Sequence, residues 1–213
     1  MLFPDPRLAD ENGIVAVGGR LNTHTLLAAY RQGIFPWPVE GYPMLWFCPA
    51  ERAVLEFAEL HVPRSLARAR RLTSLRFTLD RAFASVIRFC AAVERPEQDG
   101  TWITDEVVEA FCEFHRRGHA HSVEAWEGDE LVGGIYGVDA GGAFCGESMF
   151  YLRPNASKLA LLHLVEHLRS RGLDWLDIQV MTPHMHALGA KHLPRETFLR
   201  KLAATRARGL KLF

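Results

Sequence analysis

The stretch AHSVEAWEGDELVGGIYGVDAGGAFCGES, residues 120–148, decides the fold of this chain. It contains three strand-like runs at about 120–127, 130–138 and 142–148. The runs are separated by Gly128-Asp129 and by Asp-Ala-Gly-Gly at 139–142, which are residues typical of hairpin turns. The stretch therefore predicts three neighbouring antiparallel strands.

Helix and strand patterns continue on both sides of this stretch. Thr104 is a typical helix-capping residue, acidic residues follow it in the first turn, and Gly118 ends the same helix. Beyond residue 60 the predicted elements are a helix from Pro63 to about Leu72, a strand over 75–79, a helix capped by Asp80 and running through Val93, the helix after Thr104, the three strands, a helix over about 156–171, a strand over 174–180 and a helix from near Pro194.

This order of strand, helix, helix, three antiparallel strands, helix and strand is that of the GNAT-type acyltransferase fold. We therefore expect an α+β fold with a mixed, mostly antiparallel sheet in a GNAT-like domain over residues 61–213. Fold analogy alone does not name the acyl donor. In an acetyltransferase, the segment equivalent to 148–158 holds the pyrophosphate of coenzyme A with backbone N–H groups. Here that segment contains no glycine, which disfavours coenzyme A as the donor.

The first 60 residues carry much of the proline and aromatic content and are predicted to form a small N-terminal domain, residues 1–60. Asn22 or Thr23 caps a helix that Gly33 ends. Three prolines over 36–43 then predict a loop without regular structure. Phe35 and Trp37 on such a loop need a partner to pack against, either a second domain or a ligand.

Composition excludes several classes of protein. The 213 residues have a formal net charge of zero, so the molecule as a whole is not a polycation for nucleic acid. No apolar run approaches the ~18 residues that a membrane span needs, and the N-terminus does not read as a leader peptide. The four cysteines form no CxxC pair. We therefore expect a cytoplasmic chain with reduced cysteines and no membrane partner.

Eight short stretches carry a resemblance to a known family. They are GIVAVGG (13–19), GIFPW (33–37), GTWIT (100–104), GHAHSVE (118–124), GGIYG (133–137), FCGESMF (144–150), NASK (155–158) and DIQ (177–179). Together they make the chain resemble the leucyl/phenylalanyl-tRNA–protein transferases over nearly its whole length. It departs from that family at Arg20, at Phe47-Cys48 and in ending soon after Gly209, which affects the rim of the site and the acceptor contacts.

The resemblance implies an aminoacyltransferase with a small N-terminal domain and a GNAT-like domain. It implies that Leu or Phe, with Met as a further donor residue, moves from aminoacyl-tRNA to the N-terminal Arg or Lys of an acceptor protein, which tags that protein for N-degron degradation. The ester donor is activated, so the protein must position an amine, help to remove a proton and stabilise an oxyanion. No cofactor or metal is required. We expect the protein to be a monomer.

Three residues are candidates for handling the amine. Asp177 and Gln179 lie two apart on a predicted strand, so their side chains share one face. The resemblance implies catalytic roles: Gln179 accepts a hydrogen bond from the amine, and Asp177 orients Gln179 and balances positive charge. Glu147 could bind the ammonium or the side chain of the acceptor's first residue. The alternatives are a strand-end pair that satisfies loop amides and an ordinary surface acid.

The Leu or Phe side chain requires an apolar pocket. Seven residues are candidates for its wall: Trp37, Trp102, Ile135, Phe144, Met149, Tyr30 and Phe111. Met149 is flexible enough to adapt to two shapes. Aromatic residues that alternate on strands are more often plain core, so this alternative stays open. Shape rejects a smaller side chain only ~10–200-fold, so leaky specificity is expected.

The tRNA contacts are predicted on the Arg-rich helix after Pro63. Arg64, Arg68 and Arg71 stand at i, i+4 and i+7, which places them on one helix face. Arginines suit phosphate contacts that carry little sequence information. The alternative is a solvated helix face.

Two rival functions remain. His163-Leu-Val-Glu-His167 matches the HxxEH zinc-peptidase pattern, but Glu196 is the single Glu that follows it as a third ligand. A non-enzymatic tRNA- or peptide-binding module would bind without forming product. His184 and His186 could border the site, although loop histidines are common.

Overall fold

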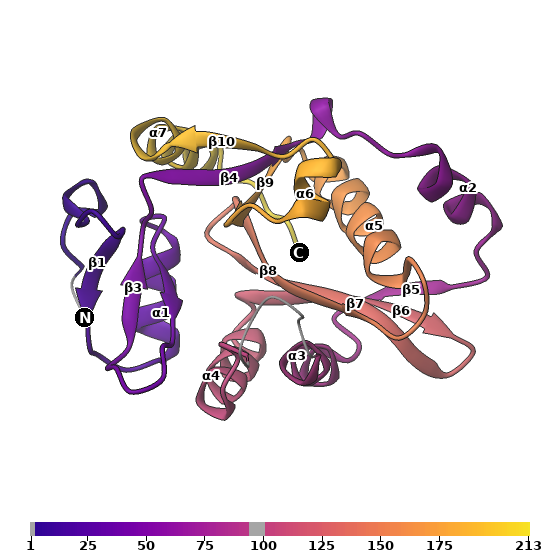
Figure 1. Cartoon of the computed structure of the whole chain (residues 1–213), viewed down its shortest axis with the longest axis horizontal. Coiled ribbons are helices and arrows are strands. Elements are labelled where there is room, and N and C mark those ends of the chain that lie inside the picture. The colour runs from indigo at the N-terminus through magenta and orange to yellow at the C-terminus, as the bar shows by residue number, and fades with distance from the viewer. Residues whose placement is uncertain (1–2, 94–100) are drawn as a thin grey trace.

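The computed structural model describes residues 3–93 and 101–213, which form a small and a large β-sheet (Figure 1). The small sheet has the strand order β1-β3-β2, and the large sheet has the order β10-β4-β9-β8-β7-β6-β5. In chain order the strands and helices are β1 (Ile14–Val17), α1 (Thr23–Tyr30), β2 (Phe35–Trp37), β3 (Leu45–Phe47), β4 (Glu51–Glu56), α2 (Arg64–Leu72), β5 (Arg76–Leu79), α3 (Phe83–Ala92), α4 (Asp105–Arg116), β6 (Ala120–Glu127), β7 (Glu130–Asp139), β8 (Phe144–Tyr151), α5 (Ala156–Ser170), β9 (Trp175–Gln179), α6 (Pro183–Ala187), β10 (Lys191–Pro194) and α7 (Arg195–Ala207). Short 3₁₀ turns lie at Pro6–Leu8 and Phe57–Glu59.

The large sheet is covered by helices on both faces. Helices α3 and α4 lie on one face of β6–β8, whereas α5 packs on the opposite face with α6 beside it (Figure 1). The expected order of elements from β5 to β9 is confirmed, and so is the antiparallel pairing of β6 with β7 and of β7 with β8. Among the described helices, none is both long enough and apolar enough to cross a membrane.

Two local predictions were wrong. The segment after Gly33 is not a loop throughout, because Phe35–Trp37 form β2 and pair with β3. The strand tolerates Pro36 because β2 is at the edge of its sheet. No further strand pairs with the outer side of β2, so the N–H that proline lacks is not needed there. Asp80 does not cap α3. It has a φ of 58° and accepts a hydrogen bond from the Ser122 N–H at 2.8 Å, so the helix begins later, at Phe83.

The chain enters the large sheet before residue 60. Strand β4 pairs with β9 and β10, so residues 51–56 lie in the same sheet as the rest of the acyltransferase-like domain. The expected domain boundary at residue 60 stays a prediction. Strand β4, which lies before this boundary, pairs with β9 and β10, which lie after it.

One extra residue interrupts the pairing of β7 with β8. Gly137 pairs with Gly146 and Tyr136 pairs with Ser148, so Glu147 is the additional residue of a β-bulge. A Cβ atom on Gly137 would lie 2.3 Å from the Cys145 carbonyl oxygen, so the bulge requires glycine at this position. The bulge turns Glu147 out of the normal alternation of side chains along β8.

Strands β8 and β9 run in parallel but pair at one register position, Cys145 with Asp177. Parallel neighbours in a sheet are usually joined by an evenly spaced ladder of hydrogen bonds. Here the pairing ends after this position, and residues of β8, β9, α5 and α6 line a cavity beyond it. The separation creates the candidate site.

Candidate functional site

A cavity of about 580 Å³ lies where β8 and β9 separate. This volume is within the range of small-molecule sites, ~300–1,000 Å³. Most of the wall is apolar: Val93, Ile135, Met149, Phe150, Tyr151, Leu161, Leu176, Ile178, Val180, Pro183 and Met185. The remaining lining residues are Gly146, Glu147, Ser148, Ser157, Lys158, Thr182 and His184. An apolar wall with a few polar groups suits an aliphatic or aromatic side chain that carries a polar end.

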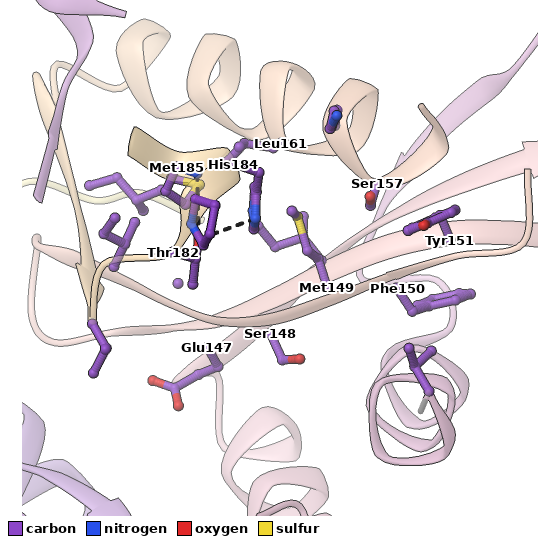
Figure 2. Close-up of a pocket in the computed structure, with 18 residues that line it drawn as sticks. Glu147, Ser148, Met149, Phe150, Tyr151, Ser157, Leu161, Thr182, His184 and Met185 are labelled. Carbon is purple, nitrogen blue, oxygen red and sulfur yellow. Dashed lines mark hydrogen bonds between the residues drawn. The ribbon is translucent and has the colours of Figure 1, made fainter. Parts of the chain in front are cut away.

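His184 is the histidine in this wall. Its Nδ1 lies 3.1 Å from the Thr182 hydroxyl, and Figure 2 shows the ring beside Met149. Burial lowers the pKa of His184, and the charge of Lys158 lowers it further. A neutral ring adds little charge to the apolar part of the cavity. The sequence placed His184 near the site, and the structure puts it in the wall.

Asp177 lies on the face of β9 opposite the cavity-lining Leu176 and Ile178. Its carboxylate forms a bidentate ion pair with Arg52, with Nε–Oδ1 and Nη2–Oδ2 distances of 2.8 Å. Both side chains are only 1% exposed. The Arg52 pKa is raised because the attraction to Asp177 outweighs the opposing effect of burial, which is the largest single influence. Arg52 therefore already neutralises the charge that Asp177 was expected to offer to the amine.

Gln179 and Glu147 meet at the edge of the cavity. The Gln179 Nε2 donates a hydrogen bond to Glu147 Oε1 at 2.6 Å. Leu176, Ile178 and Val180 line the cavity and neither Asp177 nor Gln179 does, as expected if these two side chains share the other face. The Gln179 N–H also donates to Asp177 Oδ1 at 2.9 Å. The Gln179 backbone has a φ of 60°, which is uncommon for a residue other than glycine and ends β9 at this position.

Glu147 has an unusual environment for a carboxyl group. Burial raises its pKa to about 8, the Asp177 charge raises it too, and the contacts with Tyr30 and Gln179 act in the opposite direction. The Tyr30 pKa is raised well above its usual value, first by burial and then by the Glu147 charge. Figure 2 shows the Glu147 carboxyl group pointing away from Met149 and His184. The bulge thus gives the cavity an acid at its edge, and its apolar wall is left unbroken.

The seven predicted aminoacyl-binding residues separate into groups. Ile135 and Met149 pair in register and line the cavity together. The other five, Tyr30, Trp37, Trp102, Phe111 and Phe144, are not among the described residues that line it. They do not share one wall with Ile135 and Met149 because they pack on other elements.

The aromatic residues form contacts of their own. Trp37 stacks on Trp102 with ring centroids 5.5 Å apart. Tyr30 packs edge-on against Phe111 at 6.4 Å. Phe144 contacts the ring of Phe213 at 5.5 Å. Tyr30 influences the site, because its hydroxyl lowers the pKa of Glu147. Gly100 of the GTWIT stretch lies outside the described residues.

The arginines of α2 separate by face. Arg64, Arg68 and Arg71 are exposed. None of the three forms an ion pair with an acid in the part of the chain that the structure describes. Arg70 instead pairs with Glu166 of α5. The predicted face is therefore free to contact phosphate.

The zinc-peptidase pattern is divided among other contacts. His163 stacks on Phe77 with ring centroids 5.3 Å apart, and His167 Nε2 lies 2.7 Å from the Leu212 carbonyl oxygen. Within residues 3–93 and 101–213, no group of three His, Cys, Asp or Glu residues could hold a metal ion. The helix geometry that the pattern implied is present, but a third ligand is not among these residues.

Sequence reasoning did not identify Arg52. The available signal was an arginine at the start of the apolar run Ala53–Leu55, since a charged side chain in a buried strand needs a partner. The cavity wall contributed by Leu161 and Met185 was also missed, because an apolar residue in a cavity wall has the same pattern as one in the core.

Comparisons with known proteins agree with this geometry. The family model "Leucyl/phenylalanyl-tRNA protein transferase" matches residues 54–203, and the model of its N-terminal domain matches residues 19–50. A relative from Anaeromyxobacter sp. (strain K) named leucyl/phenylalanyl-tRNA–protein transferase is 54% identical over 94% of this chain and 86% of its own length. A relative of the same name from Shewanella denitrificans is 49% identical over 92% of this chain and 83% of its own.

Among solved structures, a functionally unknown conserved protein from Staphylococcus epidermidis matches with a TM-score of 0.42 and 10% identity, over 85% of this chain and 68% of its own. The family models cover most of the chain, and the named relatives align along nearly all of it. The chain belongs to the leucyl/phenylalanyl-tRNA–protein transferase family.

Proposed function

We propose that this protein transfers Leu or Phe from the 3′ end of aminoacyl-tRNA to the N-terminal Arg or Lys of an acceptor protein, with Met as a further donor residue. The observation that carries this proposal is the apolar cavity that ends at the Glu147–Gln179 pair. A Leu or Phe side chain would lie against Ile135 and Met149. Its ester carbonyl would then stand at the edge of the cavity, where the amine arrives.

Glu147 and Gln179 are proposed to handle that amine. Gln179 donates its Nε2 hydrogen to Glu147, which leaves Gln179 Oε1 to accept a hydrogen bond from the nucleophile. An α-amino group has a pKa of ~8, and Glu147 has a pKa of about 8. Matched values favour proton transfer between the two groups in either direction. Glu147 therefore both binds the ammonium and accepts its proton.

The bond changes then balance without a cofactor. The nitrogen lone pair attacks the ester carbonyl, an N–C bond forms, and the C–O bond to the ribose breaks. The ammonium gives its first proton to Glu147 before the attack, and the second proton that the nitrogen loses moves to the departing ribose oxygen. Glu147 then releases the proton it received to solvent and returns to its starting state. Asp177 acts through Gln179: the Asp177 carboxylate accepts a hydrogen bond from the backbone N–H of Gln179.

The tRNA body is proposed to contact the exposed face of α2. Arg64, Arg68 and Arg71 offer three guanidinium groups, and Arg70 points to α5 instead. Such contacts position the tRNA and leave the choice of amino acid to the cavity.

The remaining proposals concern the cellular setting. Cys48, Cys90 and Cys145 are buried, which suits the reducing cytoplasm where charged tRNA is present. We propose that the protein acts there as a monomer and that its product enters the N-degron pathway.

The deciding experiment supplies labelled Leu-tRNA and a peptide that begins with Arg. Label on the peptide's N-terminus supports the transferase. Peptides that begin with Lys and with Ala are run beside it, and the proposal expects product with Lys and little with Ala. Binding of both substrates without product would instead support a tRNA- or peptide-binding module.

A further inference from the structure

We infer that Arg52 is a positioning residue of the transfer reaction: it holds Asp177 in place, and Asp177 in turn sets the conformation of Gln179. The inference rests on the proposed role of Gln179 and deepens it. Arg52 lies on β4, outside the cavity, so it acts through other residues and touches no substrate.

Arg52 is fixed from every direction. Its Nε and Nη2 each donate to Asp177 at 2.8 Å, and its Nη1 donates to the Gly33 carbonyl at 3.2 Å. The guanidinium carbon lies 4.5 Å from the centre of the Phe35 ring and 4.6 Å from that of Phe198. A planar group between two rings, with all three nitrogens bonded, has one orientation.

Asp177 has no acceptor site left for a substrate. Its Oδ1 accepts from Arg52 Nε and from the Gln179 N–H, and its Oδ2 accepts from Arg52 Nη2 and from the Cys145 thiol at 3.3 Å. A carboxylate offers about four lone-pair positions. Burial raises the pKa of Cys145, so the thiol is a neutral donor. Four donors occupy those positions, and Asp177 can therefore neither take a proton from the amine nor contact it.

What remains for Asp177 is the Gln179 backbone. The left-handed φ of 60° at Gln179 is a conformation that L-residues seldom adopt without support. The 2.9 Å bond from its N–H to Asp177 Oδ1 provides that support. The side chain then reaches Glu147 on the neighbouring strand. A continuous line of contacts thus runs from Arg52 on β4 to Glu147 on β8.

The register of β4 against β9 is irregular at the same place. Ala53 pairs with Gln179 and Val54 pairs with Asp177, so the step between them is a bulge or a related irregularity. This irregularity lies immediately after Arg52, whose side chain spans from β4 to β9. The pair therefore stabilises a local geometry that the regular ladder would not give.

A double-mutant cycle separates positioning from simple stabilisation. We would measure kcat and KM for Leu-tRNA and for the Arg-initiated peptide in wild type, R52K, Q179A and R52K/Q179A. R52K keeps the charge but loses the bidentate geometry. We expect R52K to lower kcat at least tenfold in the wild-type background, to change KM for Leu-tRNA less than threefold, and to lower kcat less than twofold in the Q179A background.

The matched control is R195K. Arg195 is a partly buried arginine whose side chain donates to backbone carbonyls of Pro49, Arg7 and Ala9. We expect wild-type kcat for this variant. The same cycle with F198L, which removes one of the two rings from the guanidinium and keeps the ion pair, provides a second test if R52K does not fold; a loss of kcat of at least threefold that vanishes in Q179A is expected.

Each outcome has one reading. Wild-type kcat in folded R52K, or equal losses in both backgrounds, overturns the inference. If Q179A itself keeps wild-type kcat, the proposed role of Gln179 fails, and the inference fails with it. If Q179A loses activity and R52K does not, the role of Gln179 stands and only the inference about Arg52 is wrong.

Discussion

Gln179 Nε2 and Glu147 Oε1 are joined by a 2.6 Å hydrogen bond across the point where β9 and β8 separate. The bond brings together the two side chains at the edge of an apolar cavity. Because one group is an amide and the other an acid with a raised pKa, the pair can accept a hydrogen bond from an amine and then take its proton.

Replacing Gln179 with Ala should lower kcat on the order of 100-fold, since misplacing the nucleophile by about 1 Å costs that much. Single-turnover transfer of labelled Leu, with tRNA binding measured in parallel, checks this. Tight tRNA binding should persist. Q32A serves as the control, because the Gln32 side chain lies just after α1 and donates to the Ala28 carbonyl of that helix. Undiminished turnover in Q179A would remove this residue from the mechanism.

The pH dependence of kcat should follow Glu147. Its pKa is about 8, so the carboxyl group is mostly neutral at pH 7 and becomes a base as the pH rises through that value. We expect kcat, measured with both substrates saturating, to rise with pH and to level off above about 8. E147Q should be slow and lose this rise. E166Q, which alters an exposed acid on α5, should keep the wild-type profile; an unchanged rise in E147Q would contradict the assignment.

Charge reversal on the exposed face of α2 should weaken tRNA binding. For R64E/R68E/R71E we expect a plot of log K against log salt that is flatter by about one unit for each tRNA phosphate that the variant no longer neutralises. R70E is the matched control from the same helix, because its side chain faces Glu166. Equally weakened binding in R70E and in the triple variant would show that overall charge, and not this face, governs the affinity.

Cavity size should set the donor preference. I135F places an aromatic ring against Met149 and leaves less room for the donor side chain. We expect the ratio of kcat/KM for Leu over Phe to rise by roughly tenfold, within the limits that shape alone allows. M149A enlarges the same cavity and should move the ratio the other way. Competition between the two charged tRNAs reports it directly. A ratio that stays constant in both variants would place the donor side chain elsewhere.

Much of the fold followed from local patterns. The hairpin residues at Gly128-Asp129, the Thr104 cap and the helix end at Gly118 act over a few residues, so the sequence predicts these elements well. Asp80 did not follow its pattern because the Ser122 N–H, 42 residues away, competes for its carboxylate. The β2 strand was missed because the tolerance of Pro36 depends on edge position, which is a property of the assembled sheet.

The site was less predictable than the fold. Period-two alternation predicted Asp177 and Gln179 on one face, in agreement with the cavity wall, which takes Leu176, Ile178 and Val180 and neither of these two; Ile135 and Met149 do line the cavity. The alternation could not show that the Glu147 side chain points away from Met149, because the bulge between them is a feature of two paired strands. The partner of Asp177 lies 125 residues earlier in the chain, and no local signal joins the two.

The additional residue at Glu147 also constrains how this part of the chain can change. Deleting Glu147 would restore a regular ladder, in which Gly146 stays opposite Gly137 and Ser148 stays opposite Tyr136. Met149 would keep its place in the cavity wall, and the acid beside it would be lost. A change of length at this position therefore removes the acid and leaves the apolar wall in place.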